Sequence, residues 1–230
     1  MNKVVRFGAI STAIAIFAFV GAATNANAQI LRDILNRMDA HYKSLTSLKA
    51  DVTMVKTDVV LGESDTYNGS TSFLPKTAKR PQYIRLDWVK PGEEHLVVIG
   101  DAYKVWKVRA GQVYVGKVDK AKNSGAAGNA FAFIGMSKAE LQANYDLNYI
   151  GQETAAGATT WHLELIPKKK DKYKSADLWI DSTGMPVQAK IVAPNNDLTT
   201  VVLSGVQKNI TIKADQFNLQ YPKTVKEIKA

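Results

Sequence analysis

The sequence predicts a mainly β fold of the α+β class: one curved antiparallel sheet of about ten or eleven strands, with about two or three helices. Two observations predict this class. From residue 50 to residue 206, most segments alternate apolar and polar residues, as strands with one buried face do. The connections between these segments are short and rich in Gly, Pro, Asn and Asp, which is typical of antiparallel neighbours. A sheet of this size curls or splits, so a helix laid against its concave side would close a cavity.

The first 28 residues predict a secretory signal peptide. Lys3 and Arg6 precede an apolar run over residues 7–23, and Ala26-Asn27-Ala28 has the small-residue spacing of a cleavage site. A membrane-anchoring helix is the alternative, which the shortness of the run disfavours. We therefore expect residues 29–230 to form one domain in the periplasm. Because the sequence has no cysteine, it can form no disulfide and carries no lipid-bearing cysteine after the cleavage site, so we expect a soluble protein.

The chain is basic, with a formal net charge of +9. Removal of Lys3 and Arg6 with the signal peptide would leave +7. A basic surface favours acidic partners such as anionic lipid or acidic proteins, although solubility alone explains the charge equally well. Export argues against nucleic acid as a partner, and we expect none.

An amphipathic helix is predicted from Ile30 onward, because apolar residues recur there at spacings of three and four. Its buried stripe contains Ile30, Leu31, Ile34, Leu35, Met38, Tyr42 and Leu45.

The first group of strands follows this helix. The clearest strand lies between Pro81 and Pro91, where Ile84, Leu86 and Trp88 point to one face. Proline cannot donate to a β-ladder, so the two prolines fit the ends of this strand. The expected strands of this half cover residues 50–61, 66–74, 80–89, 94–99, 103–109 and 113–118.

The middle of the chain differs in composition. Residues 123–130 are small and glycine-rich, and the apolar Phe131, Phe133 and Ile134 follow them. Ser137 and Glu140 then stand at the spacing of a capping box, so a short helix is predicted to start there and to end near Tyr145. An apolar patch on a flexible tether predicts a lid, although an ordinary connecting helix is the alternative.

The second half returns to strands, with Trp161, Leu163 and Leu165 on one face. The expected strands cover residues 147–153, 161–166, 176–180, 187–192 and 198–206, and one helical turn is expected at 214–217. A tail begins at Tyr221.

Catalytic and metal-binding patterns are weak. His41, His95 and His162 lack metal-ligand spacing, and no serine has the glycines of a nucleophile elbow. Asp87, Glu93 and Glu94 cluster near one strand end, where paired carboxylates could do acid–base work but where solvated turn residues are also common. We therefore expect a protein that is not an enzyme and needs neither a metal nor a cofactor.

The order of several short motifs resembles the LolA family of periplasmic outer-membrane lipoprotein carrier proteins, over essentially the whole mature chain. These motifs are Leu45-Thr46-Ser47-Leu48, Arg80-Pro81, Val97-Val98-Ile99-Gly100-Asp101, Trp106, Trp179-Ile180-Asp181, Gly184-Met185-Pro186 and Phe217.

This resemblance implies an unclosed antiparallel β-barrel with helices that form a lid over a hydrophobic cavity. It implies a monomeric chaperone that binds the acyl chains of lipoproteins, receives them from an inner-membrane lipoprotein-releasing ABC transporter and delivers them to an outer-membrane lipoprotein receptor. A periplasmic lipid or glycolipid carrier, or an envelope-stress sensing module on the same fold, is the alternative.

The resemblance also implies roles for individual residues. Arg80 matches the family arginine that latches the closed lid, with Lys79 as the substitute if the preceding loop displaces Arg80. Phe131, Phe133 and Ile134 are the expected lid residues. The expected cavity wall consists of Ile84, Leu86, Trp88, Trp106, Val108, Trp161, Leu163 and Leu165.

Overall fold

A computed structural model describes residues 20–117, 136–169 and 173–229 of the chain. In these residues the fold is one unclosed sheet of twelve strands with two α-helices. The strand order is β12-β6-β5-β4-β3-β2-β1-β11-β10-β9-β8-β7, so strands that follow one another in sequence are mostly neighbours. All neighbouring pairs are antiparallel except β12 and β6, which are parallel.

The elements before residue 118 are α1 (Val20–Ser44), β1 (Leu48–Asp58), β2 (Glu63–Leu74), β3 (Tyr83–Lys90), β4 (Glu94–Ile99), β5 (Ala102–Lys107), the 3-10 helix η1 (Val108–Ala110) and β6 (Gln112–Lys117). Those after residue 135 are α3 (Lys138–Asn144), β7 (Tyr145–Ala155), β8 (Ala158–Pro167), β9 (Ser175–Ile180), β10 (Pro186–Val192), β11 (Leu198–Lys208), the 3-10 helix η3 (Ala214–Phe217) and β12 (Lys226–Lys229).

The strand count exceeds the expected ten or eleven because of β12, a strand in the C-terminal tail. Its four residues contain one apolar side chain, Ile228, so they carry no alternation that a strand prediction could detect. The strand forms because the tail lies beside the edge strand β6, whose free N–H and C=O groups can pair with it.

Several boundaries also differ from the expected ones. Helix α1 begins at Val20, ten residues before Ile30, in a stretch whose four alanines favour a helix but which has no apolar stripe at helical spacing. Strand β5 ends at Lys107 because residues 108–110 form η1, and Gly111 then adopts a left-handed conformation (φ +60°). The capping box at Ser137 is confirmed: its side chain accepts a hydrogen bond from the Glu140 N–H, and the Glu140 carboxylate accepts one from the Ser137 N–H.

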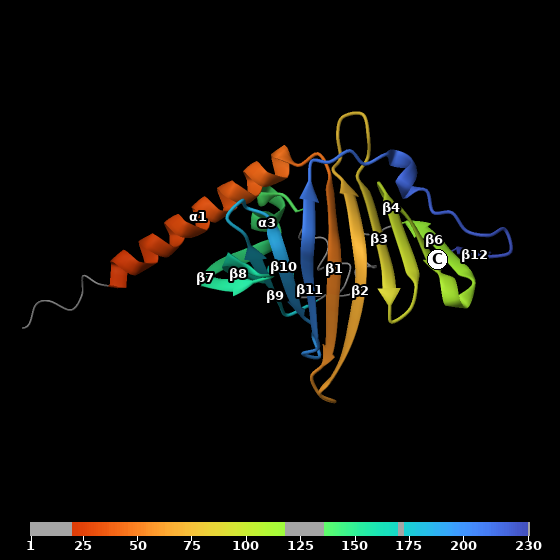
Figure 1. Ribbon diagram of the computed structural model, residues 1–230. Helices are drawn as coiled ribbons and strands as arrows, with labels where there is room; N and C mark the ends of the chain where they lie inside the picture. The colour runs from red at the N-terminus through yellow and green to blue at the C-terminus, as the bar shows by residue number, and fades with distance from the viewer. Residues whose placement is uncertain (1–19, 118–135, 170–172, 230) are drawn as a thin grey trace, which may run out of the picture.

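The two faces of the sheet differ in what covers them. We call the face that carries Met54, Leu86 and Leu163 the inner face, and the opposite face the outer face. The stripe of α1 that includes Ile34, Leu35 and Met38 is buried in the same hydrophobic cluster as the inner-face residues. Figure 1 shows α1 and α3 beside the β7–β10 half of the sheet.

The turn between β9 and β10 fixes α1 at close range. Gly184 has φ +87°, and a Cβ atom placed on it would lie 2.3 Å from the Arg37 carbonyl oxygen of α1. Only glycine fits this position, because both the left-handed backbone and the close approach of the helix exclude a side chain.

The C-terminal segment covers part of the outer face. Phe217 of η3 is 1 % exposed and packs with Leu74 and Val97, and the ring of Tyr83 contacts it at 5.2 Å between centroids. The Arg85 guanidinium donates a hydrogen bond to the Gln216 carbonyl oxygen at 2.6 Å. Figure 1 shows this segment crossing the β3–β4 end of the sheet before it reaches β6. Within the described residues, no helix has the length and the apolar character needed to cross a bilayer.

Candidate functional site

The inner face is apolar across its central strands because their registers align the apolar positions. Val52 and Met54 of β1 stand opposite Leu203 and Val201 of β11. All four side chains are at most 3 % exposed. Since directly paired residues point to the same face, the apolar set of each strand adds to that of its neighbour.

On one side of this centre, β3 contributes three of the expected wall residues. Its register pairs Ile84 with Phe73, Leu86 with Thr71, and Trp88 with Gly69 on β2. The alternation predicted for this strand therefore places Ile84, Leu86 and Trp88 together on the inner face. Leu86 and Trp88 are buried, whereas Ile84 is half-buried.

On the other side, β8 contributes three more. Leu163 pairs with Leu178, Leu165 with Ala176, and Trp161 lies opposite Ile180 on β9. Leu163 and Leu165 are fully buried under α1, and the half-buried Trp161 ring lies 5.4 Å from the Arg37 guanidinium carbon. The β3 and β8 residues thus belong to one continuous hydrophobic cluster, although several strands separate them in the sheet order.

The other two expected wall residues lie elsewhere. Trp106 pairs with His95, which pairs with Asp87, so its side chain is on the outer face. There its ring contacts His95 and Tyr221 at 5.3 Å and 6.1 Å between centroids. Val108 is half-buried in η1 and is not part of the inner-face cluster. Trp106 was assigned to the wrong face because a large apolar side chain indicates burial but does not indicate which face of the sheet the residue occupies.

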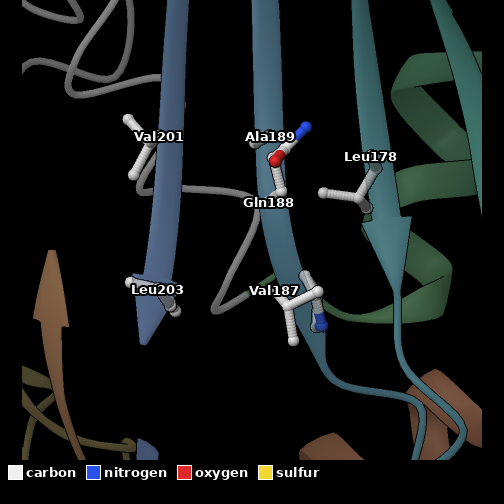
Figure 2. Close-up of a pocket in the computed structure, with 7 residues that line it drawn as sticks. Leu178, Val187, Gln188, Ala189, Val201 and Leu203 are labelled. Atoms are coloured by element: carbon white, nitrogen blue, oxygen red, sulfur yellow. The ribbon is translucent and has the colours of Figure 1, made fainter. Parts of the chain in front are cut away.

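A small hollow lies over β9, β10 and β11. Its inner-face lining consists of Leu178, Ala189, Val201 and Leu203, with Pro186, Val187 and Gln188 beside them. Figure 2 shows Leu178, Ala189, Val201 and Leu203 arranged along these three strands. The four inner-face residues that line it are apolar and almost fully buried, so the hollow is a small gap in the packing of these strands.

The expected latch residue is held by its own loop. The Arg80 Nη2 donates to the Pro75 carbonyl oxygen at 3.2 Å, and the guanidinium carbon lies 5.8 Å from the Tyr83 ring centroid. The Nε of Arg80 is buried and has no hydrogen-bond partner within the described residues. Tyr83 points to the outer face, so the Arg80 guanidinium lies near an outer-face ring. Lys79, the expected substitute, is exposed.

The expected lid residues Phe131, Phe133 and Ile134 lie outside the described residues. The described part of the covering layer is α1 with α3, joined by a hydrogen bond from the Lys138 Nζ to the Asn36 side-chain oxygen at 2.7 Å. The helix residues Ile34, Leu35 and Met38 were predicted as a buried stripe but not as part of the site. Their amphipathic period could not reveal which strands they would cover.

Two titratable groups near the inner face, His41 and Tyr145, have shifted pKa values. Burial lowers the pKa of His41 on α1; the nearby Lys208 lowers it further, and Asp181 opposes the shift. Burial raises the pKa of Tyr145, whose hydroxyl forms a hydrogen bond with that of Tyr173.

Two histidines on the outer face form polar networks. Ring nitrogens of His95 lie 2.6 Å from Asp87 and 3.1 Å from Glu93 oxygens, so two of the three clustered carboxylates meet at one histidine. His162 lies 2.7 Å from an Asp177 oxygen and stacks on Trp179. No group of three or more His, Asp or Glu side chains within the described residues could hold a metal ion.

The fold resembles that of several solved structures. An uncharacterized conserved protein from Thermus thermophilus is 13 % identical with a TM-score of 0.58, and the match covers 88 % of this chain and all of that one. MucB is 14 % identical with a TM-score of 0.51, over 84 % of this chain and 63 % of MucB. A LolA superfamily protein from Nitrosomonas europaea is 12 % identical with a TM-score of 0.42, over 82 % and 97 % of the two chains. The first two likenesses describe the fold alone.

A search of curated proteins found no match to this chain. The family model described as outer membrane lipoprotein carrier protein LolA matches residues 68–220, about two thirds of the sequence. That match spans β3 and β8 with the six inner-face residues assigned above, and it ends just after η3. The chain therefore belongs to the LolA family.

Proposed function

We propose that this protein is a periplasmic carrier that binds the acyl chains of lipoproteins on its inner face. One observation supports this most: a continuous apolar face extends from Trp88 on β3 to Trp161 on β8, across a sheet whose ends do not close. Each acyl CH₂ group removed from water on such a face contributes roughly 0.8 kcal/mol. The protein acts by binding, without catalysis and without a cofactor.

Release of cargo requires that protein groups compete with acyl chains for the same face. Helix α1 covers the β7–β10 half, and the residues around Phe131, Phe133 and Ile134 are proposed as the lid over the remainder. An equilibrium between covered and open forms lowers the net affinity by the cost of opening. We propose that an inner-membrane ABC transporter supplies the cargo and that an outer-membrane receptor removes it.

The first experiment identifies the cargo. The protein is purified from the periplasm of its own cells and analysed by native mass spectrometry without detergent. A bound acylated lipoprotein supports the proposal. A bound phospholipid or glycolipid instead supports the alternative lipid carrier, and a bound envelope protein without acyl chains supports the sensing module.

The second experiment places the cargo on the inner face. Leu96 and Ile99 are both half-buried on β4, but Leu96 faces inward opposite Leu86, whereas Ile99 faces outward near Phe217. Leu96→Asn is expected to weaken uptake of a fluorescent fatty acid about ten-fold, the effect of losing one aliphatic contact. Ile99→Asn provides a control of similar cost to stability, and equal loss of uptake in both variants would contradict the proposal.

The latch is tested by Arg80→Leu. If Arg80 latches the lid, this variant retains its cargo and delivers it more slowly to acceptor vesicles that carry the receptor. An unchanged delivery rate would remove Arg80 from the mechanism, as its contacts with Pro75 and Tyr83 on its own loop and strand would then be structural.

A further inference from the structure

The turn between β1 and β2 exposes three consecutive apolar residues. Val59, Val60 and Leu61 are 49 %, 85 % and 68 % exposed. Hairpin turns normally consist of Gly, Asn, Asp, Ser or Pro, and a run of exposed apolar residues is unfavourable in water unless it has a function. Nothing in the packing of the domain requires these side chains, since none belongs to a hydrophobic cluster of the described residues.

The backbone of this turn is ordered by its own hydrogen bonds. The Asp58 carboxylate accepts from the N–H groups of Val60 and Leu61, both at 2.9 Å. The Asp58 carbonyl oxygen accepts from the Gly62 N–H at 2.9 Å, and Asp197 accepts from the Val59 N–H at 3.4 Å. The N–H groups of residues 59–62 are therefore satisfied without water or a partner.

The turn also extends beyond one of its two neighbouring strands, β3, whereas on its other side β11 begins at Leu198, opposite Thr57. Strand β3 ends at Lys90, opposite Asn68, whereas β2 continues for five more residues to Glu63. At 3.3–3.4 Å per residue, the hairpin projects about 17 Å past the end of β3. Figure 1 shows this turn at the lower end of the sheet, where the β1–β2 hairpin extends furthest.

The charges near the turn decide what kind of surface it fits. Lys56, Asp58, Glu63 and Asp65 flank it, so the hairpin end is acidic although the chain carries a net charge of +9. Attraction to anionic headgroups therefore does not explain the exposed side chains. Contact with an apolar medium does explain the exposed side chains, because a backbone that enters such a medium must have its N–H groups already hydrogen-bonded. A protein partner would normally supply hydrogen bonds of its own.

We propose that Val59, Val60 and Leu61 form a membrane-contact tip that inserts between lipid headgroups to the level of the first acyl carbons. The Asp58 carboxylate stays with the N–H groups of Val60 and Leu61 at the headgroup level, and Glu63 stays in water, so only the apolar side chains reach the acyl carbons. Insertion is driven by apolar transfer, so it occurs on uncharged lipid surfaces and persists in high salt.

The tip adds to the proposed function a means of meeting a bilayer, and it does not depend on what the inner face binds. A carrier that exchanges acylated cargo at membranes needs contact with the lipid surface. The two ideas fail separately, because the tip is tested with vesicles that contain no cargo protein and no receptor.

The test uses the absence of cysteine in the sequence. The exported protein is purified, and mass spectrometry confirms that the apolar run at residues 7–23 has been removed, because that run would itself bind lipid. Leu61→Cys is labelled with an environment-sensitive fluorophore and mixed with phosphatidylcholine vesicles at about 1 M NaCl, where charges are screened beyond about 3 Å. Ile150→Cys on β7 is the matched control, since Ile150 is 55 % exposed.

The expected result is a blue shift of the Leu61 label and its quenching by brominated acyl chains, with neither change at Ile150. The unlabelled double variant Val60→Ser/Leu61→Ser is expected to bind vesicles about ten-fold or more weakly than the parent protein, with an unchanged circular dichroism spectrum. No shift at Leu61, or equal vesicle binding by the double variant, would overturn the proposal. A shift that follows protein concentration in the absence of vesicles would also overturn it, by identifying a second copy of this chain as the occupant.

Discussion

The indole ring of Trp88 on β3 lies against Gly69 on β2, and the two residues are direct cross-strand partners. A Cβ atom at Gly69 would lie 2.9 Å from the ring carbon Cε3 of Trp88 and 2.2 Å from the Asp87 carbonyl oxygen. The missing side chain of Gly69 therefore leaves space for the Trp88 ring on the inner face, where only 6 % of Trp88 is exposed. Gly69 thus sets the position of the largest side chain on the β3 side of the candidate site.

Gly69→Ala is expected to lower the free energy of unfolding by about 1–3 kcal/mol, because β3 must move away from the new methyl group. Urea unfolding followed by tryptophan emission measures both the stability and the altered environment of Trp88. Gly151→Ala on β7 is the control, since a Cβ atom there meets no atom within 4 Å. Equal losses of unfolding free energy in the two variants would show that the contact between Gly69 and Trp88 does not contribute to stability.

Gly184→Ala is expected to release α1 from the β9–β10 turn. The substitution combines an unfavourable left-handed backbone with a contact of 2.3 Å to the Arg37 carbonyl oxygen, so a loss of about 2–4 kcal/mol is expected. Gly157→Ala separates the two causes, because Gly157 also has positive φ (+75°) but an unobstructed Cβ position. In thermal unfolding, the melting temperature of Gly184→Ala should be clearly lower than that of Gly157→Ala. The same melting temperature for both variants would contradict the close approach of the helix.

Stability is expected to decrease in acid through His41. Burial and the neighbouring Lys208 lower the pKa of His41 in the folded protein below its ordinary value of 6.5. The unfolded chain therefore binds a proton first, so this contribution to stability is complete above pH 6.5 and is lost as the pH falls through the lowered folded-state pKa. Unfolding free energies measured from pH 7 downward should fall less steeply in His41→Gln than in the parent protein. Parallel curves would contradict this, and an NMR titration of His41 with a midpoint above 6.5 would do so directly.

Arg85→Met is expected to loosen the C-terminal segment from the outer face. It removes the hydrogen bond to the Gln216 carbonyl oxygen at 2.6 Å and the contact with Asp87 at 2.7 Å, while the aliphatic part of the side chain is kept. A charge-assisted hydrogen bond of this kind contributes about 1.5–3 kcal/mol. Faster proteolysis within residues 209–225 and faster amide exchange at Phe217 are expected, with the exposed Arg109→Met as the control. Unchanged proteolysis would show that the Phe217 contacts alone hold the segment.

Alternation along each strand predicted much of the candidate site. Ile84, Leu86 and Trp88 were grouped on one face from their spacing, as were Trp161, Leu163 and Leu165, and the structure places all six on the inner face. This works because a strand has a fixed period of two, so the relative orientation of residues within it follows from their numbers. Alternation does not show which face of one strand lies on the same side of the sheet as a given face of another strand. For this reason Trp106 was grouped with these residues although it faces outward.

Length, composition and periodicity by themselves determined the mainly β class, the long amphipathic helix, the capping box at Ser137 and the turn positions, because these depend on interactions between residues close in sequence. Tertiary structure decided the rest. The pairing of β1 with β11 aligns the apolar faces of the two halves, and the close contact of Gly184 with Arg37 sets where α1 lies on them. The parallel pairing of β12 with β6 recruits a tail that has no strand pattern of its own. Each of these depends on contacts between residues far apart in the chain, whose free energy no local sequence pattern records.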